Sequence, residues 1–276
     1  MESESRLADR PTLGIRRACP AGLWAAVRLR FPILRFRFPA LTDYRTRFLQ
    51  LALRAEALRF GEFTLKSGRI SPYFFDAGRF DSGTALTGLA GCYADATDAA
   101  GVGFDMLFGP AYKGIPLATA LACEYARRGR DLPLAFNRKE AKAHGEGGSL
   151  IGAPLAGRRV LIVDDVITAG TAIREALDII RDGGGIPAGI VIALDRQEVV
   201  VEKTVDEGGA ADGPAHSAAQ AVTIASGIPV IAVAGLEDLL AFAGESAELL
   251  DQRERLLAYR VRYGCRALIH DAPTGG

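Results

Sequence analysis

Val160-Leu-Ile-Val-Asp-Asp-Val-Ile-Thr-Ala-Gly-Thr-Ala172 combines a short apolar strand, a pair of acidic residues and a turn that leads directly into a helix. The turn from Thr168 to Thr171 would present backbone N–H groups and the positive end of a helix dipole, which suits a phosphate monoester. Asp164 and Asp165 cannot both be buried as ionised groups, so we expect them at the end of the sheet, where they can accept hydrogen bonds from a diol or hold Mg²⁺. The segment predicts a site for ribose hydroxyls beside a 5′-phosphate; the alternative is a surface acidic pair before an N-capped helix.

Strands and helices alternate on both sides of this segment. Because the strands are continuously apolar, they fit a parallel sheet covered by helices on both faces. The predicted fold class is therefore α/β, and ligands are expected at the carboxyl ends of the strands. The periodicity predicts helices at 43–59, 83–100, 115–128, 171–181, 236–242 and 245–263, strands at 105–108, 134–136, 160–163, 189–194 and 229–233, and a strand–turn–strand around Ser67-Gly68.

Three stretches fall outside this pattern. Residues 1–41 carry eight arginines against three acidic residues, a net charge of +5, which leaves −5 for residues 42–276. This extension is a basic arm, an organelle-type presequence or translated sequence upstream of the true start; we favour the last, with 42–276 as the folded domain. Residues 137–154 are charged and glycine-rich, which predicts a mobile functional loop. Residues 198–218 are predicted to be a flexible low-complexity insertion.

The composition excludes several classes of protein. The chain has 276 residues, of which 49% are hydrophobic, and a formal net charge of zero, which is unlike a disordered chain. Four widely spaced cysteines form no C-x-x-C pair, so we expect reduced thiols in the cytoplasm rather than a disulfide scaffold. No apolar stretch reaches 18 residues without a charge, so no membrane span is expected. The mildly acidic body implies no broad basic face for nucleic acid.

Competing phosphate and metal motifs are absent from the sequence. There is no Gly-Lys dipeptide and hence no P-loop, and Gly101-Val-Gly103 lacks the third glycine of a dinucleotide fingerprint. The three histidines are too scattered for a zinc site. Only five of the 33 basic residues are lysines, so each is a candidate for a role that needs a compact ammonium group: Lys66, Lys113, Lys139, Lys142 and Lys203.

These motifs together resemble the type I phosphoribosyltransferase family and, within it, the orotate phosphoribosyltransferases. Residues 160–172 resemble the family's phosphoribosyl pyrophosphate motif, and four of the five lysines fall in further matching segments. The resemblance runs from about Thr42 to the C-terminus and implies a central, mostly parallel sheet with flanking helices and a small N-terminal hood. The further segments are Thr64–Arg69, Ser71–Asp76, Gly109–Pro116, Asn137–Gly148 and Leu194–Glu198.

The resemblance implies transfer of a phosphoribosyl group from phosphoribosyl pyrophosphate to orotate in pyrimidine synthesis. Asp164 and Asp165 would engage the ribose hydroxyls, and the following loop would hold the 5′-phosphate. Mg²⁺ is the implied cofactor, held mainly through the substrate, with no certain protein ligand. The implied catalytic residues are Lys142, His144, Asp164 and Asp165. The residues implied to bind phosphoribosyl pyrophosphate are Lys66, Tyr112, Lys113, Arg138, Lys139, Lys142, His144, Asp164, Asp165, Val166, Ile167, Thr168, Ala169, Gly170, Thr171 and Ala172.

Orotate is implied to contact Phe74, Phe75, Thr168 and Arg196, because a planar guanidinium suits its carboxylate. In the family, part of the loop reaches the neighbouring subunit's site, so a homodimer with shared sites is implied, without nucleic-acid or membrane partners. One alternative is a transferase for a purine base, which would offer no carboxylate to Arg196. Another is a regulator that senses phosphoribosyl pyrophosphate and touches nucleic acid through residues 1–41. The intact loop and the lack of helix-turn-helix periodicity count against it.

Overall fold

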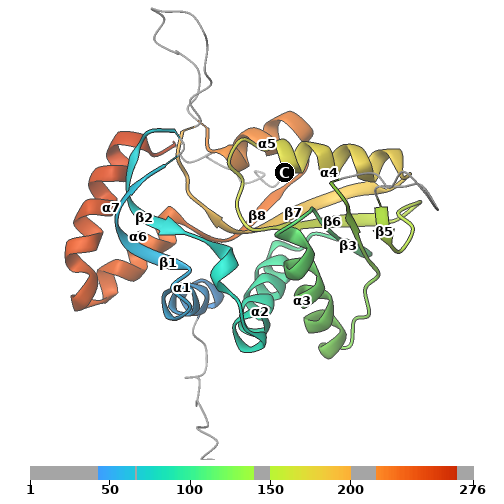
Figure 1. The fold of residues 1–276 in the computed structure, drawn as a ribbon, viewed down its shortest axis with the longest axis horizontal. Helices are drawn as coiled ribbons and strands as arrows, with labels where there is room; N and C mark the ends of the chain where they lie inside the picture. The colour runs from blue at the N-terminus through green and yellow to red at the C-terminus, as the bar shows by residue number, and fades with distance from the viewer. Residues whose placement is uncertain (1–42, 66, 140–149, 200–215, 266–276) are drawn as a thin grey trace, which may run out of the picture. The chain divides into compact units, whose positions relative to one another are not determined.

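A six-stranded sheet forms the centre of the fold (Figure 1). The computed structural model describes residues 43–65, 67–139, 150–199 and 216–265, and all of them belong to one compact unit, Leu41–Gly276. The strand order is β5-β4-β3-β6-β7-β8, and every neighbouring pair is parallel except β4 and β5. This confirms the predicted α/β class. The strands are β3 (Met106–Gly109), β4 (Leu134–Asn137), β5 (Leu150–Gly152), β6 (Arg159–Asp164), β7 (Ile186–Asp195) and β8 (Val230–Gly235).

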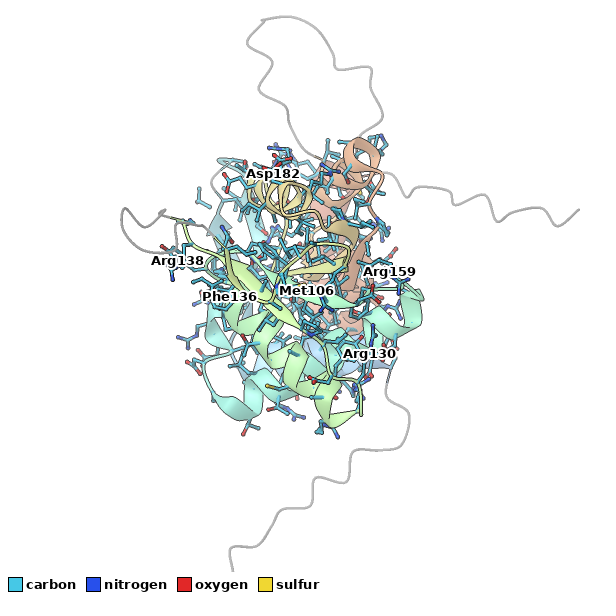
Figure 2. All side chains as sticks on the ribbon, turned by 90° about the vertical axis from the view of Figure 1, so that its right-hand side faces the viewer. Met106, Arg130, Phe136, Arg138, Arg159 and Asp182 are labelled. Carbon is cyan, nitrogen blue, oxygen red and sulfur yellow. The ribbon has the colours of Figure 1, made fainter. Side chains whose placement is uncertain are left out.

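Helices cover both faces of this sheet. Figure 1 shows α1 (Tyr44–Arg54), α2 (Gly83–Ala100) and α3 (Gly114–Arg127) below it, and α4 (Thr171–Asp182) and α5 (Ala218–Ser226) above it. Figure 2 shows Phe136 of β4, Met106 of β3 and Arg159 of β6 in that order across the sheet, with Asp182 at the end of α4 on one side and Arg130 beyond α3 on the other. Helices therefore cover both faces of the sheet, as the continuously apolar strands predict.

The alternation of side chains along β6 explains why its sequence is continuously apolar. Val160 and Ile162 pack into the core beneath α4 and α5, whereas Leu161 and Val163 pack into the core on the opposite face. All four are fully buried. Burial of each side chain is worth about 1.5–3 kcal/mol, so the strand is held from both sides. Its last residue, Asp164, is thereby fixed at the edge of the sheet.

A small hood lies apart from this sheet. It is the antiparallel hairpin of β1 (Leu58–Thr64) and β2 (Ile70–Phe75), as predicted around Ser67-Gly68, followed by the short 3₁₀ turn η1 (Ala77–Arg79). The hairpin lies beside the last helix, α7 (Leu250–Tyr263), which packs on α6 (Leu236–Glu245) (Figure 1). The rings of Tyr73 and Tyr259 meet edge to face with centroids 6.3 Å apart, which joins β2 to α7.

Several boundaries differ from the predictions. The first helix ends at Arg54 rather than 59, and the predicted helix 245–263 is broken at Ser246, which is extended, before the 3₁₀ turn η2 (Ala247–Leu249) and α7. The short strand β5 and the helix α5 were not predicted. Helix α5 lacks charged residues and so shows no amphipathic pattern, but a capping box between Ser217 and Gln220 starts it.

Two expectations about the chain's environment can be compared with the described residues. None of their helices has the length and apolar character needed to cross a membrane. Cys92, Cys123 and Cys265 are free, as expected, and Cys19 lies outside the described residues.

The predicted insertion 198–218 lies mostly outside the described residues. Both of its ends are nevertheless built into the fold, since Glu198 is paired with Arg196 and Ser217 is fully buried.

Candidate active site

The site lies where the strand order reverses. The chain leaves β3 for β4 on one side and leaves β6 for β7 on the other, so a crevice opens between the carboxyl ends of β3 and β6. The turn carrying Tyr112 and Lys113 follows β3, while Asp164 ends β6 and Asp165 follows it. Gly114 allows the close approach of the two, because a Cβ atom there would lie 2.6 Å from the carbonyl oxygen of Val163.

Lys113 joins the two sides of this crevice. Its Nζ lies 2.8 Å from Oδ2 of Asp165 and 3.4 Å from Oδ1 of Asp76 in the hood. Burial opposes the charge of Lys113, but the bonds to Asp165 and Asp76 outweigh it and raise the pKa of the ammonium group. The lysine that was predicted to meet pyrophosphate is therefore held by carboxylates in this state.

The acidic pair is more buried than we expected. Asp164 and Asp165 lie at the end of β6, as expected, but they are only 8% and 6% exposed. Lys113 compensates the charge of Asp165. Burial, together with the neighbouring charge of Asp165, raises the pKa of Asp164 to about 7, so the cost of a second buried charge is reduced by proton uptake. The hydroxyl of Tyr93 donates to the Asp164 carbonyl at 2.8 Å and fixes the strand end.

The loop from Val166 to Ala172 opens the helix α4. Thr168, Ala169, Thr171 and Ala172 are exposed, whereas Ile167 is buried and Val166 is half-buried. Gly170 has a left-handed φ of 70° directly before the first helical turn, whose N–H groups lack intrahelical partners. This arrangement can bind a phosphate group through backbone N–H groups and the helix dipole.

A cavity of about 450 Å³ lies between the hood, this loop and the end of β7. All four residues predicted to contact orotate line it: Phe74, Phe75, Thr168 and Arg196. The ring of Phe75 also packs on Phe48 and Phe80, and that of Phe74 packs on Phe63. The structure thus brings together residues that are more than 120 positions apart in the chain.

The charged loop after β4 is described only in part. Arg138 is half-buried and Lys139 is exposed, with the Lys139 Nζ 5.2 Å from the centroid of the Tyr112 ring. Asn137 accepts a hydrogen bond from the Ala111 N–H at 2.9 Å and so ties the end of β4 to the turn after β3. The predicted residues Lys66, Lys142 and His144 lie outside the described residues.

Sequence reasoning missed several residues at this site. Asp76 and Asn137 hold the turn after β3, and Arg69 and Glu198 lie on the wall of the cavity near Arg196. Each falls inside one of the segments that carry the family resemblance, but nothing in its local sequence indicates its partner. Within the described residues, no group of three or more His, Cys, Asp or Glu side chains could hold a metal ion.

Known proteins share both the sequence and the fold. Residues 83–208 match the family model of the phosphoribosyl transferase domain. The chain is 75% identical over 224 residues to the orotate phosphoribosyltransferase of Xanthomonas oryzae pv. oryzae (strain MAFF 311018), and the match covers 81% of this chain and 98% of that protein.

Solved structures agree with this similarity. The crystal structure of the orotate phosphoribosyltransferase of Francisella tularensis has 40% identity and a TM-score of 0.67, covering 79% of this chain and 98% of that one. The enzyme of Mycobacterium tuberculosis H37Rv, solved in complex with 5-phospho-alpha-D-ribosyl 1-diphosphate, has 26% identity and a TM-score of 0.51, covering 71% of this chain and 98% of that one. The likeness therefore extends over most of the folded domain.

Proposed function

The chain belongs to the orotate phosphoribosyltransferase family, and on that premise we propose how its own residues carry the reaction. The enzyme transfers the phosphoribosyl group of 5-phospho-α-D-ribose 1-diphosphate to orotate, which gives orotidine 5′-monophosphate and diphosphate in pyrimidine biosynthesis. The reaction replaces the C1–diphosphate bond of the ribose with a bond to a ring nitrogen of orotate. The protein must hold the sugar still and stabilise the negative charge that grows on the departing diphosphate.

We propose that orotate binds in the 450 Å³ cavity. The residues that line this cavity are the observation that carries the assignment. The cavity combines apolar rings, which suit a flat pyrimidine, with the guanidinium of Arg196, which suits its carboxylate. Thr168 lines the same cavity and belongs to the loop before α4, so it would lie between the base and the sugar phosphate. A purine base would offer no carboxylate to Arg196.

The sugar donor is proposed to bind along the adjacent crevice. Asp164 and Asp165 would accept hydrogen bonds from the ribose hydroxyls, and Val166–Ala172 would hold the 5′-phosphate. The diphosphate would lie near Tyr112 and Lys113 and meet the cationic side chains of the loop after β4. These are Arg138, Lys139, Lys142 and His144, and Lys66 of the hood completes the set. Lys113 would then exchange its carboxylate partners for diphosphate oxygens when the donor binds.

Mg²⁺ is proposed to enter with the donor rather than to occupy a cage of protein ligands. The acidic pair supplies two carboxylates at the crevice, and Lys113 already engages one oxygen of Asp165. That donor set fits an ion whose remaining ligands are substrate oxygens and water. When bound, Mg²⁺ would neutralise part of the charge on the diphosphate.

We further propose a cytoplasmic homodimer in which residues of the loop 137–154 reach the partner subunit's site. The free cysteines of the described residues support a reducing compartment. The loop begins at the end of β4 and carries cationic residues that a diphosphate would attract. Neither nucleic acid nor a membrane is a proposed partner.

The proposed base site is tested by an orotate-consumption assay with the donor and Mg²⁺, with adenine, hypoxanthine and uracil as competing acceptors. Wild-type enzyme should consume orotate in strong preference to the other bases, and Arg196→Ala should lose that preference. A variant at Arg196 that binds and consumes orotate normally would remove Arg196 from the base site. Faster turnover of a purine than of orotate would favour the purine-transferase alternative.

A further inference from the structure

One edge of the Arg196 guanidinium is covered by a single carboxylate oxygen. Oε1 of Glu198 lies 2.8 Å from Nε and 2.6 Å from Nη2 of Arg196. Both side chains are largely buried, with 17% of Arg196 and 13% of Glu198 exposed. An ion pair with little access to water resists rotation of either partner, because a guanidinium that turns away leaves a buried carboxylate unpaired. Glu198 therefore restricts how Arg196 can be oriented.

The strand β2 holds the same guanidinium from a second direction. Nη2 of Arg196 donates to Oγ of Ser71 at 3.0 Å, while that hydroxyl donates to the carbonyl oxygen of Tyr73 at 2.7 Å. Cζ of Arg196 lies over the Tyr73 ring, 4.3 Å from its centroid. These contacts use Nε and Nη2. Among the hydrogen bonds of the described residues none uses Nη1, so this nitrogen retains donors for a ligand in the cavity.

The backbone that carries these residues is fixed by contacts that do not use the Glu198 carboxylate. Gln197 has a left-handed φ of 50°, and its N–H donates to Oδ1 of Asp195. Oε1 of Gln197 accepts from the N–H of Glu237, in the first turn of α6. The carbonyl of Gln197 accepts from Cys265 at 2.8 Å, and Val199 donates to Tyr263 at 2.9 Å. Substitution of the Glu198 side chain should therefore leave this turn folded.

A second arginine lies beside the same carboxylate. Nη1 of Arg69 lies 3.7 Å from Oε2 of Glu198, and Nη2 of Arg69 donates to the Val199 carbonyl at 2.9 Å. Two guanidinium groups thus share one carboxylate, which leaves one positive charge uncompensated within the group. A single ligand carboxylate would restore the balance, whereas an uncharged base would not.

We propose that Glu198 is a positioning residue for the known reaction: it holds Arg196 with Nη1 available to the carboxylate of orotate, and so contributes to the preference for a carboxylated pyrimidine. The inference rests on the proposed assignment of Arg196 to orotate. Glu198 does not itself contact the base in this scheme. It acts through Arg196, so its loss should affect an acceptor with a carboxylate and spare one without it.

The experiment compares orotate with uracil, which lacks the carboxylate, in wild-type enzyme, Glu198→Ala and Glu198→Gln. The ratio of kcat/KM for orotate to that for uracil should fall by about tenfold or more in Glu198→Ala, mainly through the KM for orotate, because the buried guanidinium loses its partner. The KM for the sugar donor should stay within about twofold. If uracil turns over too slowly, its inhibition constant against orotate gives the same comparison.

Glu198→Gln and a control separate positioning from loss of structure. The amide keeps one acceptor oxygen but no charge, so it should recover part of the orotate preference that Glu198→Ala loses. Glu56→Gln is the control: it removes the carboxylate of an exposed ion pair with Arg79 in the hood. It should leave the ratio of kcat/KM for orotate to that for uracil unchanged. If Glu198→Ala lowers the rates with orotate and uracil equally, Glu198 supports the fold rather than Arg196, and the proposal is wrong.

A double-mutant cycle distinguishes this failure from a failure of the proposed function. In an Arg196→Ala background, Glu198→Ala should cause no further loss of orotate preference, because its effect passes through the missing guanidinium. If Arg196→Ala lowers the preference but Glu198→Ala does not, only the positioning role fails. If Arg196→Ala leaves the preference intact, the orotate assignment fails and the positioning role fails with it.

Discussion

At the scale of single residues, the site combines buried charge with function. Asp164 is nine-tenths buried and lies next to a second carboxylate, that of Asp165. Its pKa is raised to about 7, mainly by burial and to a lesser extent by the charge of Asp165. A protein without a diol to bind would gain by placing an amide or apolar group there. We propose that Asp164 keeps its carboxylate, despite this cost in stability, because the carboxylate holds the ribose of the sugar donor.

Replacement of this carboxylate should stabilise the fold in a pH-dependent way. The folded protein keeps the Asp164 proton up to about pH 7, whereas the unfolded chain releases it near the ordinary value of 3.8, so folded-state stability falls as the pH rises through this window. Asp164→Asn cannot ionise, and its Oδ1 can still accept from the Asp165 N–H, as Asp164 does at 2.9 Å. We expect its Tm to exceed that of wild type by several degrees at pH 8 and by much less at pH 5.

Thermal unfolding at the two pH values checks this, with activity measured in parallel. Asp178→Asn is the matched control, because its side chain is 73% exposed, and its Tm difference from wild type should be small at both pH values. Asp164→Asn should also lose most of its activity. Equal Tm differences at pH 5 and pH 8 would show that the Asp164 proton does not contribute to stability.

Lys142 illustrates a residue whose role is expected in the transition state. A lysine that meets the departing diphosphate acts on charge that develops during the reaction, so Lys142→Ala should lower kcat by about a hundredfold or more and leave the KM for orotate within a few-fold. Lys203→Ala is the control, since this lysine lies outside the family segments, and it should retain full activity. Steady-state kinetics of both variants decide the matter; an unchanged kcat with a raised KM would assign Lys142 to ground-state binding.

At the scale of elements, the loop before α4 depends on one backbone conformation. Gly170 has a φ of 70°, and a Cβ atom there would approach Cγ2 of Val222 to 3.2 Å and Nη1 of Arg174 to 3.4 Å. Arg174 in turn donates to the Ala169 carbonyl at 3.0 Å, which holds the loop from the helix side. The loop geometry is thus fixed from within α4 before any phosphate binds.

Gly170→Ala should therefore separate stability from donor binding. The left-handed conformation costs an alanine about 1–2 kcal/mol, and the same cost applies at Gly227, where φ is 72° and no atom lies within 4 Å of an added Cβ. Both variants should lose similar stability in denaturant unfolding, but only Gly170→Ala should raise the KM for the sugar donor, by about tenfold. An equal donor KM in the two variants would mean that the loop tolerates the shift.

The elements also show what the sequence can predict. The apolar strands and the acidic pair that follows β6 are local patterns, and they predict the α/β class, a site at the carboxyl ends of the strands and the residue Asp164. The role of Lys113 was implied only by the family resemblance. Helix α5 was missed because its nine residues carry no charge to mark an exposed face. Glu198 was quoted as part of a matching segment, but its pairing with Arg196 follows from the left-handed Gln197, which no propensity predicts for a glutamine.

At the scale of the whole molecule, the site is assembled from segments that lie far apart in the chain. The hood supplies Phe74, Phe75 and Ser71, which accepts a hydrogen bond from Arg196, while the sheet supplies the acidic pair and the loop before α4. The Lys113–Asp76 contact is one point at which the two parts meet across the crevice. An arrangement of this kind leaves the diphosphate end open to cationic groups from the loop 137–154, and the proposed dimer would supply them from the neighbouring subunit.

Shared sites can be detected by complementation. One subunit carries Lys142→Ala, and the other carries Asp164→Asn with Asp165→Asn; each homodimer should be nearly inactive. In a heterodimer, the intact acidic pair of the first subunit would meet the intact Lys142 of the second, which gives one working site. Random pairing of equal amounts makes half of the dimers mixed, so roughly a quarter of the sites should work in a twofold-symmetric dimer.

Co-expression with two different affinity tags, followed by sequential purification, isolates the mixed dimer and raises the expected value to roughly half of the wild-type activity. A mixed dimer of wild type and the double acidic variant controls for assembly and should also show about half. Activity in the mixed mutant dimer no higher than the mean of its two parents would mean that each loop serves its own subunit. The cationic loop and the acidic pair would then act within one chain, and the loop 137–154 would have to close over the crevice from β4 of the same subunit.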